Sequence, residues 1–309
     1  MSFTTRTQLP DTFLTDMLPA LRAVTMNQFD RYGDEYNKIF NVDDSNRSIE
    51  QFTEVTGLGT LDEISEGESV HFDGPIQGFD KTYTHRKFGK GYKVSQEFID
   101  DDKHRIIEGL AKALGRSARE TIEIEAALVV NRGFNSSYTG PDGKVLFATD
   151  HPNVGGGAQS NRPTVAVDLD VPALEAALTA FRGWTDHRGI KVRVVPTRLV
   201  VPGALEFTAA KLLGGTMQGD TANNTINAFK KRSGMKAFDD WMVWNYLTDD
   251  DMWLVLAAPE DLELRFFWRK RFSTVSEKDF DSDSVKTAGR MRFSVGWNQW
   301  LGAYASPGA

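Results

Sequence analysis

The segment from Ser95 to Phe134 constrains the fold more than any other part of the chain, because it predicts one unusually long helix over 100–133. Apolar residues recur at helical spacing and charged residues fill the opposite face. The apolar positions are Ile106, Ile107, Leu110, Leu114, Ala118, Ile122, Ala126 and Val129. The aspartates at 100–102 are expected to cap its start, and Gly133 to end it. A helix of about 30 residues is roughly 45 Å long, enough to span one edge of a domain.

Composition excludes several function classes. The chain has 309 residues, a net charge of −7 and no cysteine. Disulfides, thiolate metal sites and a cysteine nucleophile are therefore excluded. An acidic chain gives no electrostatic reason to expect tight nucleic-acid binding. Asp11 and Asp16 interrupt the N-terminus, so it does not resemble a signal peptide, and no apolar run is long enough for a membrane span.

The segments before the long helix are polar and rich in glycine. Residues 1–45 predict an arm with one amphipathic helix over 12–32, interrupted at Pro19. Residues 48–94 alternate short strand-like runs with glycines, which indicates a long two-stranded excursion. Few of its residues are bulky and apolar, so the excursion is not expected to be stable alone. A neighbouring subunit is the simplest surface for it to lie on.

The segments after the long helix predict a mixed α+β arrangement with two compact parts. A short strand is expected at 145–147, between turns at 141–143 and 155–157. Further helices are expected at 171–184 and 203–213, followed by a polar loop at 214–236. Strands are expected at 191–202, 241–247, 252–259, 262–272 and 290–297.

No residue is assigned to catalysis, to a cofactor or to a metal. His151 follows Asp150 and His187 follows Asp186, which raises an acid–base or metal interpretation. A turn is favoured for both segments, because Asp, Pro and Gly surround the histidines and no helical metal-binding spacing is present. The chain has no G-x-S-x-G nucleophile motif and no phosphate-binding glycine loop. The glutamates of the long helix are interpreted as a solvated or ion-paired face.

Two charged segments are candidates for contacts between copies of the chain. The excursion from 54 to 73 carries acidic residues and no Lys or Arg, whereas the strand at 262–272 is strongly basic. The candidates are Glu54, Asp62, Glu63, Glu66, Glu68, Asp73, Arg265, Arg269, Lys270 and Arg271. Both segments fit simple solvated charge clusters, and both fit an acidic ribbon that docks on a basic surface of an adjacent copy. Such docking would set register and assembly rate more than affinity.

The order of elements resembles that of tailed-phage major capsid proteins of the Hong Kong 97 type, and is especially similar to the major head subunits of Mu-like phages. The local match is most specific at LFATDHPN (146–153) before GGGAQSN, and continues through RLVVPGALEFTAAKLL (198–213). The closing VKTAGRMRFSVGW (285–297) also resembles the family. The resemblance covers nearly the whole chain in element order, and 146–213 at motif level.

The resemblance implies an α+β Hong Kong 97-like capsid fold with four parts. These are an N-terminal arm at 1–47, an extended β-hairpin loop at 48–94, a peripheral domain at 95–164 and 281–309 built on the spine helix, and an axial domain at 165–280. The loop is expected to reach over a neighbouring subunit. Its tip has no lysine, unlike relatives that cross-link this loop to an asparagine, so no covalent network is expected.

The implied function is a major capsid protein and not an enzyme. Hexamers and pentamers are expected to form an icosahedral virion shell around double-stranded DNA, with weak nonspecific DNA contacts and no membrane. A separate scaffolding protein, a portal and an optional cement protein are the implied partners, and assembly is expected in the bacterial cytoplasm. Two alternatives stay open. One is an encapsulin-like nanocompartment, and the other is a soluble hydrolase that uses His151 or His187.

Overall fold

The spine of the protein is the helix α4 (His104–Asn131). The computed structural model describes residues 18–100, 104–214, 229, 240–279 and 284–309. The prediction of a long helix is confirmed, but residue 100 belongs to a separate short helix, α3 (Gln96–Asp100), so the predicted start was wrong. The capping residues Asp101 and Asp102 lie outside the described residues.

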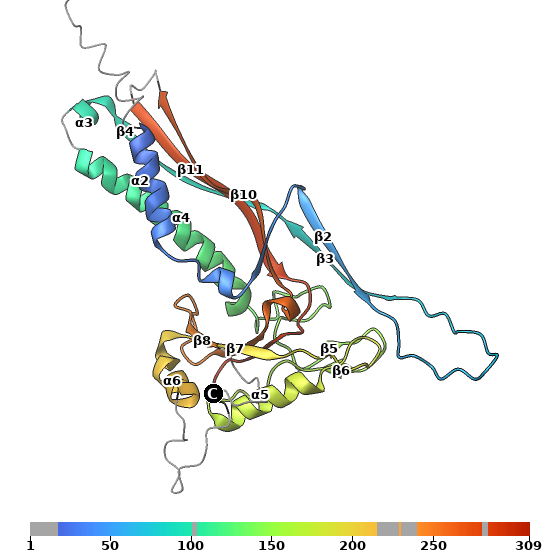
Figure 1. Ribbon diagram of the computed structural model, residues 1–309. Coiled ribbons are helices and arrows are strands. Elements are labelled where there is room, and N and C mark those ends of the chain that lie inside the picture. Colours follow the sequence, from blue (N-terminus) through green and yellow to red (C-terminus); the bar gives the residue numbers. More distant parts are fainter. Residues whose placement is uncertain (1–17, 101–103, 215–228, 230–239, 280–283) are drawn as a thin grey trace, which may run out of the picture.

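A second helix, α2 (Leu18–Arg31), lies along α4 (Figure 1). The two backbones approach each other closely at Gly115, where a Cβ atom would lie 2.3 Å from the carbonyl oxygen of Thr25. The other side of α4 faces a sheet, and its buried residues include Leu114, Ala118 and Ile122. The predicted apolar face is therefore largely confirmed. Ile106 and Leu110 are the exceptions, because both are exposed in the single chain.

The first sheet contains the two longest strands. Its order is β1 (Asn41–Asp44), β10 (Leu264–Asp279), β11 (Ser284–Trp297) and β4 (Arg86–Ser95). β1 is parallel to β10, and the other neighbours are antiparallel. The predicted strands at 262–272 and 290–297 are confirmed and are longer than expected. β4 joins this sheet, although the sequence placed its residues in the two-stranded excursion.

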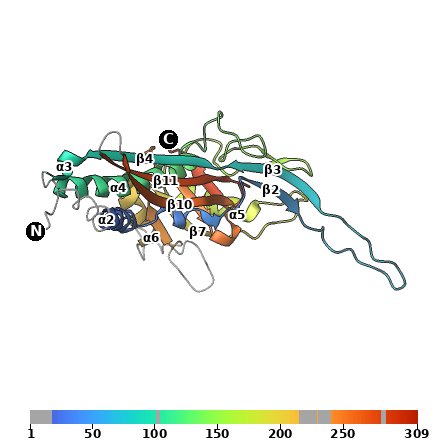
Figure 2. The same ribbon diagram turned by 90° about the horizontal axis from the view of Figure 1, so that it is seen from above.

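The extended ribbon consists of only β2 (Ile49–Thr56) and β3 (Ile76–Thr84), paired antiparallel. Between them lies the loop 57–75, which contains no strand. Figures 1 and 2 both show this loop projecting far from the rest of the molecule. The register shifts between Thr53 and Val55, so Glu54 lies opposite a bulge formed by Gly78 and Phe79 on β3. A two-stranded excursion was expected, and it is confirmed in this shorter form.

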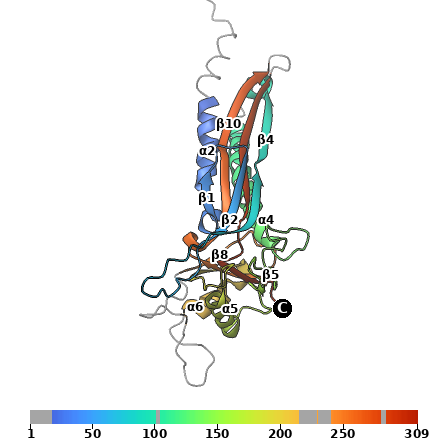
Figure 3. The same ribbon diagram turned by 90° about the vertical axis from the view of Figure 1, so that its right-hand side faces the viewer.

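The second sheet forms the other lobe (Figure 3). Its order is β12 (Ala303–Ser306), β9 (Trp253–Ala257), β7 (Pro196–Val201) and β8 (Asp240–Val243). Helices α5 (Val171–Gly183) and α6 (Glu206–Gly214) accompany it, with the short turns η4 (Gly203–Leu205) and η5 (Pro259–Asp261). The C-terminal segment thus contributes β11 to the first sheet and β12 to the second.

Local sequence signals explain α5. Asp170 accepts a hydrogen bond from the backbone N–H of Ala173 at 2.7 Å, and Pro172 lies in the first turn. Both are standard start signals for a helix. Leu174, Ala177 and Phe181 are buried at helical spacing. The predicted helix at 171–184 is confirmed within one residue, because a cap and an apolar stripe coincide.

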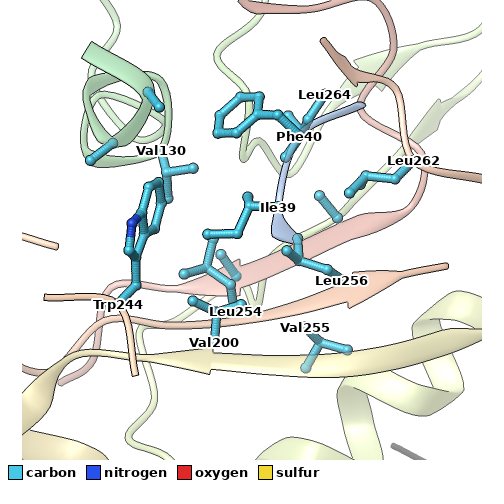
Figure 4. Packing of buried hydrophobic residues seen from close by; sticks show 14 of the residues in the cluster. Ile39, Phe40, Val130, Val200, Trp244, Leu254, Val255, Leu256, Leu262 and Leu264 are labelled. Atoms are coloured by element: carbon cyan, nitrogen blue, oxygen red, sulfur yellow. The ribbon is translucent and has the colours of Figure 1, made fainter. Parts of the chain in front are cut away.

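One hydrophobic core joins the two lobes. The turn η3 (Tyr36–Lys38) leads to Ile39 and Phe40, which are both buried. Figure 4 shows Ile39 between α4, which carries Val130, and the strands that carry Val200 and Leu254. Figure 4 also shows Trp244 beside Val130. Since residues of both sheets, α4 and α5 belong to this cluster, the lobes are packed together rather than hinged through a linker.

The segment between α4 and α5 contains the short strands β5 (His151–Pro152) and β6 (Ala158–Gln159). The predicted strand at 145–147 is wrong, because these residues form no ladder although Leu146 and Phe147 are buried. The Phe147 ring packs where a side chain on Gly133 would be, 2.5 Å from an added Cβ. A glycine is therefore needed at 133 for packing, after the last residue of α4.

Candidate subunit-contact surfaces

The loop 57–75 combines exposed apolar side chains with a purely acidic charge. Leu61 is 99% exposed and Phe72 is 98% exposed, while Leu58, Ile64 and Val70 are also exposed. The predicted candidates Asp62, Glu63, Glu66 and Glu68 all lie on this loop and are exposed. Its internal contacts are few: Glu68 accepts from the Ser65 N–H at 3.1 Å, and the His71 ring lies 3.3 Å from Asp62. The loop is thus an apolar and acidic surface held away from its own chain.

Glu54 does not belong to this free surface. Its Oε1 lies 2.9 Å from Nε2 of His187, and the same oxygen accepts a hydrogen bond from the side chain of Gln299. The Glu54 side chain packs so close to the ribbon that a Cβ on Gly78 would lie 2.8 Å from its carboxylate. The expectation that Glu54 is part of the ribbon's acidic tip was wrong, because Glu54 lies on β2, on the strand face whose side chains at 50, 52, 54 and 56 are buried or half-buried.

His187 is part of the anchor of the ribbon. Its Nδ1 accepts from the backbone N–H of Val154 at 3.4 Å, and its Nε2 faces Glu54. The Nε2–Oε1 distance fits a charge contact, although the N–H is not aligned for a linear hydrogen bond. The Phe79 ring meets the imidazole edge-on at 5.7 Å. These contacts hold the loop end of the ribbon, near Glu54 and Phe79, against the segment between α5 and β7.

Asp73 forms a second, exposed anchor. Two guanidinium nitrogens of Arg188 contact its carboxylate, one of them at 2.7 Å. The Gly59 N–H donates to Asp73 at 3.0 Å. This backbone hydrogen bond, and then the Arg188 hydrogen bond, hold the pKa of Asp73 below its usual value. Asp73 is therefore engaged within its own chain, and no local sequence pattern identifies Arg188 as its partner.

The basic strand is largely neutralised by its own chain. Arg265 contacts Asp43 at 3.2 Å and Glu263 at 3.0 Å, and Arg271 contacts Asp44 at 3.1 Å. Asp43 and Asp44 lie on β1, which is next to β10 in the sheet. Arg269 is half-buried and Lys270 is exposed. The proximity of β1 was not visible in the sequence, since 222 residues separate Asp43 from Arg265.

His85 lies at the junction between β3 and β4, where the ribbon leaves the first sheet. Its Nε2 lies 3.0 Å from the Ser45 hydroxyl, and its Nδ1 lies 3.0 Å from the Ser294 hydroxyl. Ser45 in turn donates to Glu50 on β2 at 2.6 Å. Burial lowers the pKa of His85, so the ring is neutral at pH 7. The network ties three segments together at the root of the ribbon.

His151 is fully buried and is not in a turn. It begins β5, and its ring stacks on Trp300 with centroids 4.7 Å apart. Nδ1 lies 2.6 Å from Asp142, and Nε2 lies 3.1 Å from the amide oxygen of Asn161. Asn161 also donates to the backbone oxygen of Ala303, which is the first residue of the edge strand β12. The motif around His151 therefore locks the loop after α4 to the C-terminal strand.

Glu123 is buried in α4 and is not part of a solvated face. Its Oε1 accepts the backbone N–H of Glu35 at 3.0 Å and that of Tyr36 at 3.3 Å. Burial is the largest cause that raises the pKa of Glu123, and the nearby Glu35 carboxylate raises it further. The arm is thus held on α4 by a side chain that the sequence analysis assigned to solvent. The predicted Arg116–Glu120 pair is confirmed at 2.7 Å.

A pocket of about 360 Å³ lies beside the C-terminal half of α4. It is formed by β3, β4, α4, the following loop and β11, and its lining includes Lys81, Arg86, Leu128, Arg132, Tyr138 and Trp297. Sequence reasoning missed this site, because its residues come from five separate segments. Within the described part of the chain, no cluster of three or more His, Asp or Glu side chains is arranged to hold a metal ion. No helix among the same residues is long and apolar enough to cross a membrane.

The chain matches one protein-family model and is similar to several solved structures. The family model described as phage capsid protein matches residues 79–306. Among solved structures, the chain is similar to one from Mycobacterium phage Patience, with a TM-score of 0.57, 13% identity and coverage of 93% of this chain and 86% of that one. It is also similar to a virus-like particle from Pyrococcus furiosus, with a TM-score of 0.56, 10% identity and coverage of 94% and 99%.

A third structure, from Microbacterium phage Oxtober96, has a TM-score of 0.51, 9% identity and coverage of 89% of this chain and 91% of that one. No curated protein matches the chain. At these identities the structures establish a shared fold, and the family model covers well over half of the sequence. The long spine helix beside a sheet, the projecting ribbon and the second lobe agree with this fold. The chain therefore belongs to the phage capsid protein family and has the Hong Kong 97 type of α+β fold.

Proposed function

We propose that this capsid protein forms the hexamers and pentamers of an icosahedral shell around phage double-stranded DNA. The observation that carries the proposal is the loop 57–75, where Leu61 and Phe72 are almost fully exposed in the single chain. Large apolar side chains gathered on a projecting loop are typical of a surface that another molecule covers. In a closed shell, the neighbouring subunit supplies that cover.

The proposed domains follow the two lobes only in part. The peripheral domain is proposed at 95–164 and 281–309 and the axial domain at 165–280, whereas β10 within the second range belongs to the first sheet and β12 within the first range belongs to the second sheet. The arm is assigned to 1–47 and the extended loop to 48–94. The acidic loop residues Asp62, Glu63, Glu66 and Glu68 are proposed to contact a neighbouring copy. Of the basic strand, Arg269 and Lys270 are the candidates without an ion pair among the described residues, while Arg265 and Arg271 have acidic partners nearby.

The protein is proposed to have no enzymatic activity. His151 is enclosed by Asp142, Asn161 and Trp300, so a substrate has no access to its ring nitrogens. His187 is engaged by Glu54 and Val154. Both histidines have packing roles that account for them without a reaction.

The proposed partners beyond other copies are a separate scaffolding protein, a portal and an optional cement protein. Packaged DNA is proposed to make weak nonspecific contacts, since a net charge of −7 leaves little general attraction for phosphate. Assembly is proposed to take place in the cytoplasm of the host bacterium. The encapsulin-like alternative uses the same fold, and the family match over 79–306 favours the phage shell.

Electron microscopy of the purified protein at rising concentration tests the proposal. Closed shells or flat sheets of capsomers are expected. Shells isolated from infected cells are expected to contain DNA, whereas an enzyme inside them would favour the nanocompartment. A monodisperse monomer that persists at high concentration would contradict the shell proposal.

A further inference from the structure

The pocket beside α4 carries a surplus of positive charge. Lys81, Arg86 and Arg132 line it together with one carboxylate, Glu125. Glu125 pairs with Arg86, so it neutralises only that cation. Among the described residues, no carboxylate lies within ion-pair distance of Lys81 or Arg132. The pocket thus has two cations without an ion pair among the described residues, although the Asp142 carboxylate favours the charge of Lys81 from a longer distance.

Both cations are held against aromatic rings. The Lys81 ammonium lies 5.9 Å from the Trp297 ring centre, and the Arg132 guanidinium lies 4.4 Å from the Tyr138 ring centre. Burial lowers the pKa of Lys81, which means that the site disfavours its charge in the single chain. An incoming carboxylate would relieve this, because a nearby opposite charge favours the charged form. The side chains of Leu128 and Trp297 provide an apolar lining between the two cations.

The loop 57–75 has the complementary chemistry. Leu61 is almost fully exposed and is followed directly by Asp62 and Glu63. The loop contains no Lys or Arg. An apolar side chain next to two carboxylates matches a pocket that combines the apolar side chains of Leu128 and Trp297 with two cations.

A chain cannot fill its own pocket in this way. Lys81 lies on β3, close to the body of the protein, and the loop projects from the far end of the same ribbon (Figures 1 and 2). The ribbon is anchored in that direction by the Glu54–His187 and Asp73–Arg188 contacts. The loop therefore reaches the pocket of another copy and not its own.

We propose that the pocket around Leu128 receives Leu61 of the loop of a second copy, with Asp62 and Glu63 of that loop facing Lys81 and Arg132. The inference rests on the proposed shell function and assigns the partner surface of its extended loop. It moves that surface from the basic strand β10, where β1 and Glu263 neutralise Arg265 and Arg271, to the pocket beside α4.

Directed disulfide formation tests the contact, since the chain has no cysteine of its own. One preparation carries Asp62→Cys, and a second carries Ser137→Cys at the exposed rim of the pocket. After co-assembly and oxidation, mass spectrometry is expected to find a peptide pair that joins positions 62 and 137. Thr179→Cys, on the exposed side of α5, is the matched control and is expected to give no such pair with Asp62→Cys.

A charge swap supplies a second readout. The loop variant Asp62→Lys with Glu63→Lys and the pocket variant Lys81→Glu with Arg132→Glu are each expected to assemble about tenfold more slowly or worse at about 0.15 M salt. Combining both sets in one chain is expected to restore much of the rate. Lys87→Glu with Lys90→Glu on β4 makes the same charge change outside the pocket lining and is expected to have little effect.

The outcomes separate the two levels of the proposal. If wild-type shells form but no 62–137 pair appears and the charge swap restores nothing, the pocket assignment is wrong while the shell function stands. If the wild-type protein never assembles, the shell function fails as well. A 62–137 pair together with restored assembly supports both.

Discussion

The carboxylate of Glu54 lies 2.9 Å from Nε2 of His187, although 133 positions separate the two residues in the sequence. This contact joins the loop end of the ribbon to the second lobe, and both side chains are largely buried. Together with the exposed Asp73–Arg188 pair, it fixes the direction in which the loop 57–75 leaves the molecule. The direction of the loop 57–75 thus depends on the contact between Glu54 and His187, which lies outside the loop itself.

Replacing His187 with Ala is expected to loosen the loop end of the ribbon, where His187 contacts Glu54. The substitution removes the contact of His187 with the largely buried Glu54 carboxylate, which keeps the hydrogen bond from Gln299, and is expected to cost about 1–3 kcal/mol of folding free energy. Chemical denaturation of the unassembled subunit measures this loss, and hydrogen exchange is expected to rise in β2 and β3. Asp73→Asn is the control, because that contact is exposed and is expected to change stability less than His187→Ala does. Equal effects of the two substitutions would contradict the proposed difference.

Glu123→Gln is expected to flatten the pH dependence of stability. The pKa of Glu123 is raised from its ordinary value of 4.5, chiefly by burial. The folded state therefore binds the proton more tightly than the unfolded chain, and stability is lost as pH rises from about 4.5 through the folded-state pKa. Glutamine carries no charge, and its oxygen can still accept the N–H groups of Glu35 and Tyr36. The variant is expected to be at least as stable as the wild type at pH 8.

Denaturation midpoints of the unassembled subunit at several pH values between 4 and 8 provide the measurement. Glu120→Gln is the matched control on the same helix, since Glu120 is partly exposed and pairs with Arg116. The control is expected to keep the wild-type slope. A Glu123→Gln protein that loses stability in parallel with the wild type would show that this carboxyl is not the source of the pH dependence.

Boiled particles are expected to run as monomers in denaturing gels. Covalent joining of the loop to a neighbour through a Lys–Asn amide needs one of these two residues on the loop, and 57–75 contains neither Lys nor Asn. In the proposed contact, the lysine of the receiving pocket meets carboxylates that act as charge partners. Electrophoresis of purified shells after heating in detergent is the check. A ladder of bands above the monomer mass would overturn this expectation.

The sequence predicts elements well where one periodic face determines the structure. α4 and α5 each have a long apolar stripe, and β10 and β11 are long alternating or apolar runs, so local pattern and final burial agree. The segment at 145–147 misled the prediction, because Leu146 and Phe147 are apolar for packing against α4 and not for a sheet. Apolar character alone does not distinguish these two uses.

The contact residues were harder to predict than the fold, for a related reason. Whether a charge is free depends on which distant segment lies opposite it. Glu54 and Glu123 were interpreted as surface charges, yet Glu54 lies on the buried face of β2 and the arm covers Glu123. Arg265 was interpreted as part of a free basic patch, yet Asp43 lies beside it through the parallel pairing of β1 with β10. Spacing along the chain does not encode these neighbours.

Two glycines of α4 provide a matched test of how α2 packs on the spine. A Cβ at Gly115 would lie 2.3 Å from the Thr25 carbonyl oxygen, whereas nothing lies within 4 Å of a Cβ at Gly109. Alanine is the better helix former by roughly 1 kcal/mol, so Gly109→Ala is expected to stabilise the subunit by up to that amount. Gly115→Ala is expected to destabilise it by about 1–3 kcal/mol, because overpacking forces α2 away from α4.

Thermal and chemical denaturation of the two unassembled variants measure the pair of effects. The opposite signs are the essential result, since both substitutions make the same chemical change in the same helix. Crystallography or cryo-electron microscopy of the Gly115→Ala protein is expected to show α2 displaced near Thr25. If Gly115→Ala instead raised stability as much as Gly109→Ala, the close crossing of α2 and α4 would be wrong, because an unobstructed helix position gains from alanine whatever its place in the sequence.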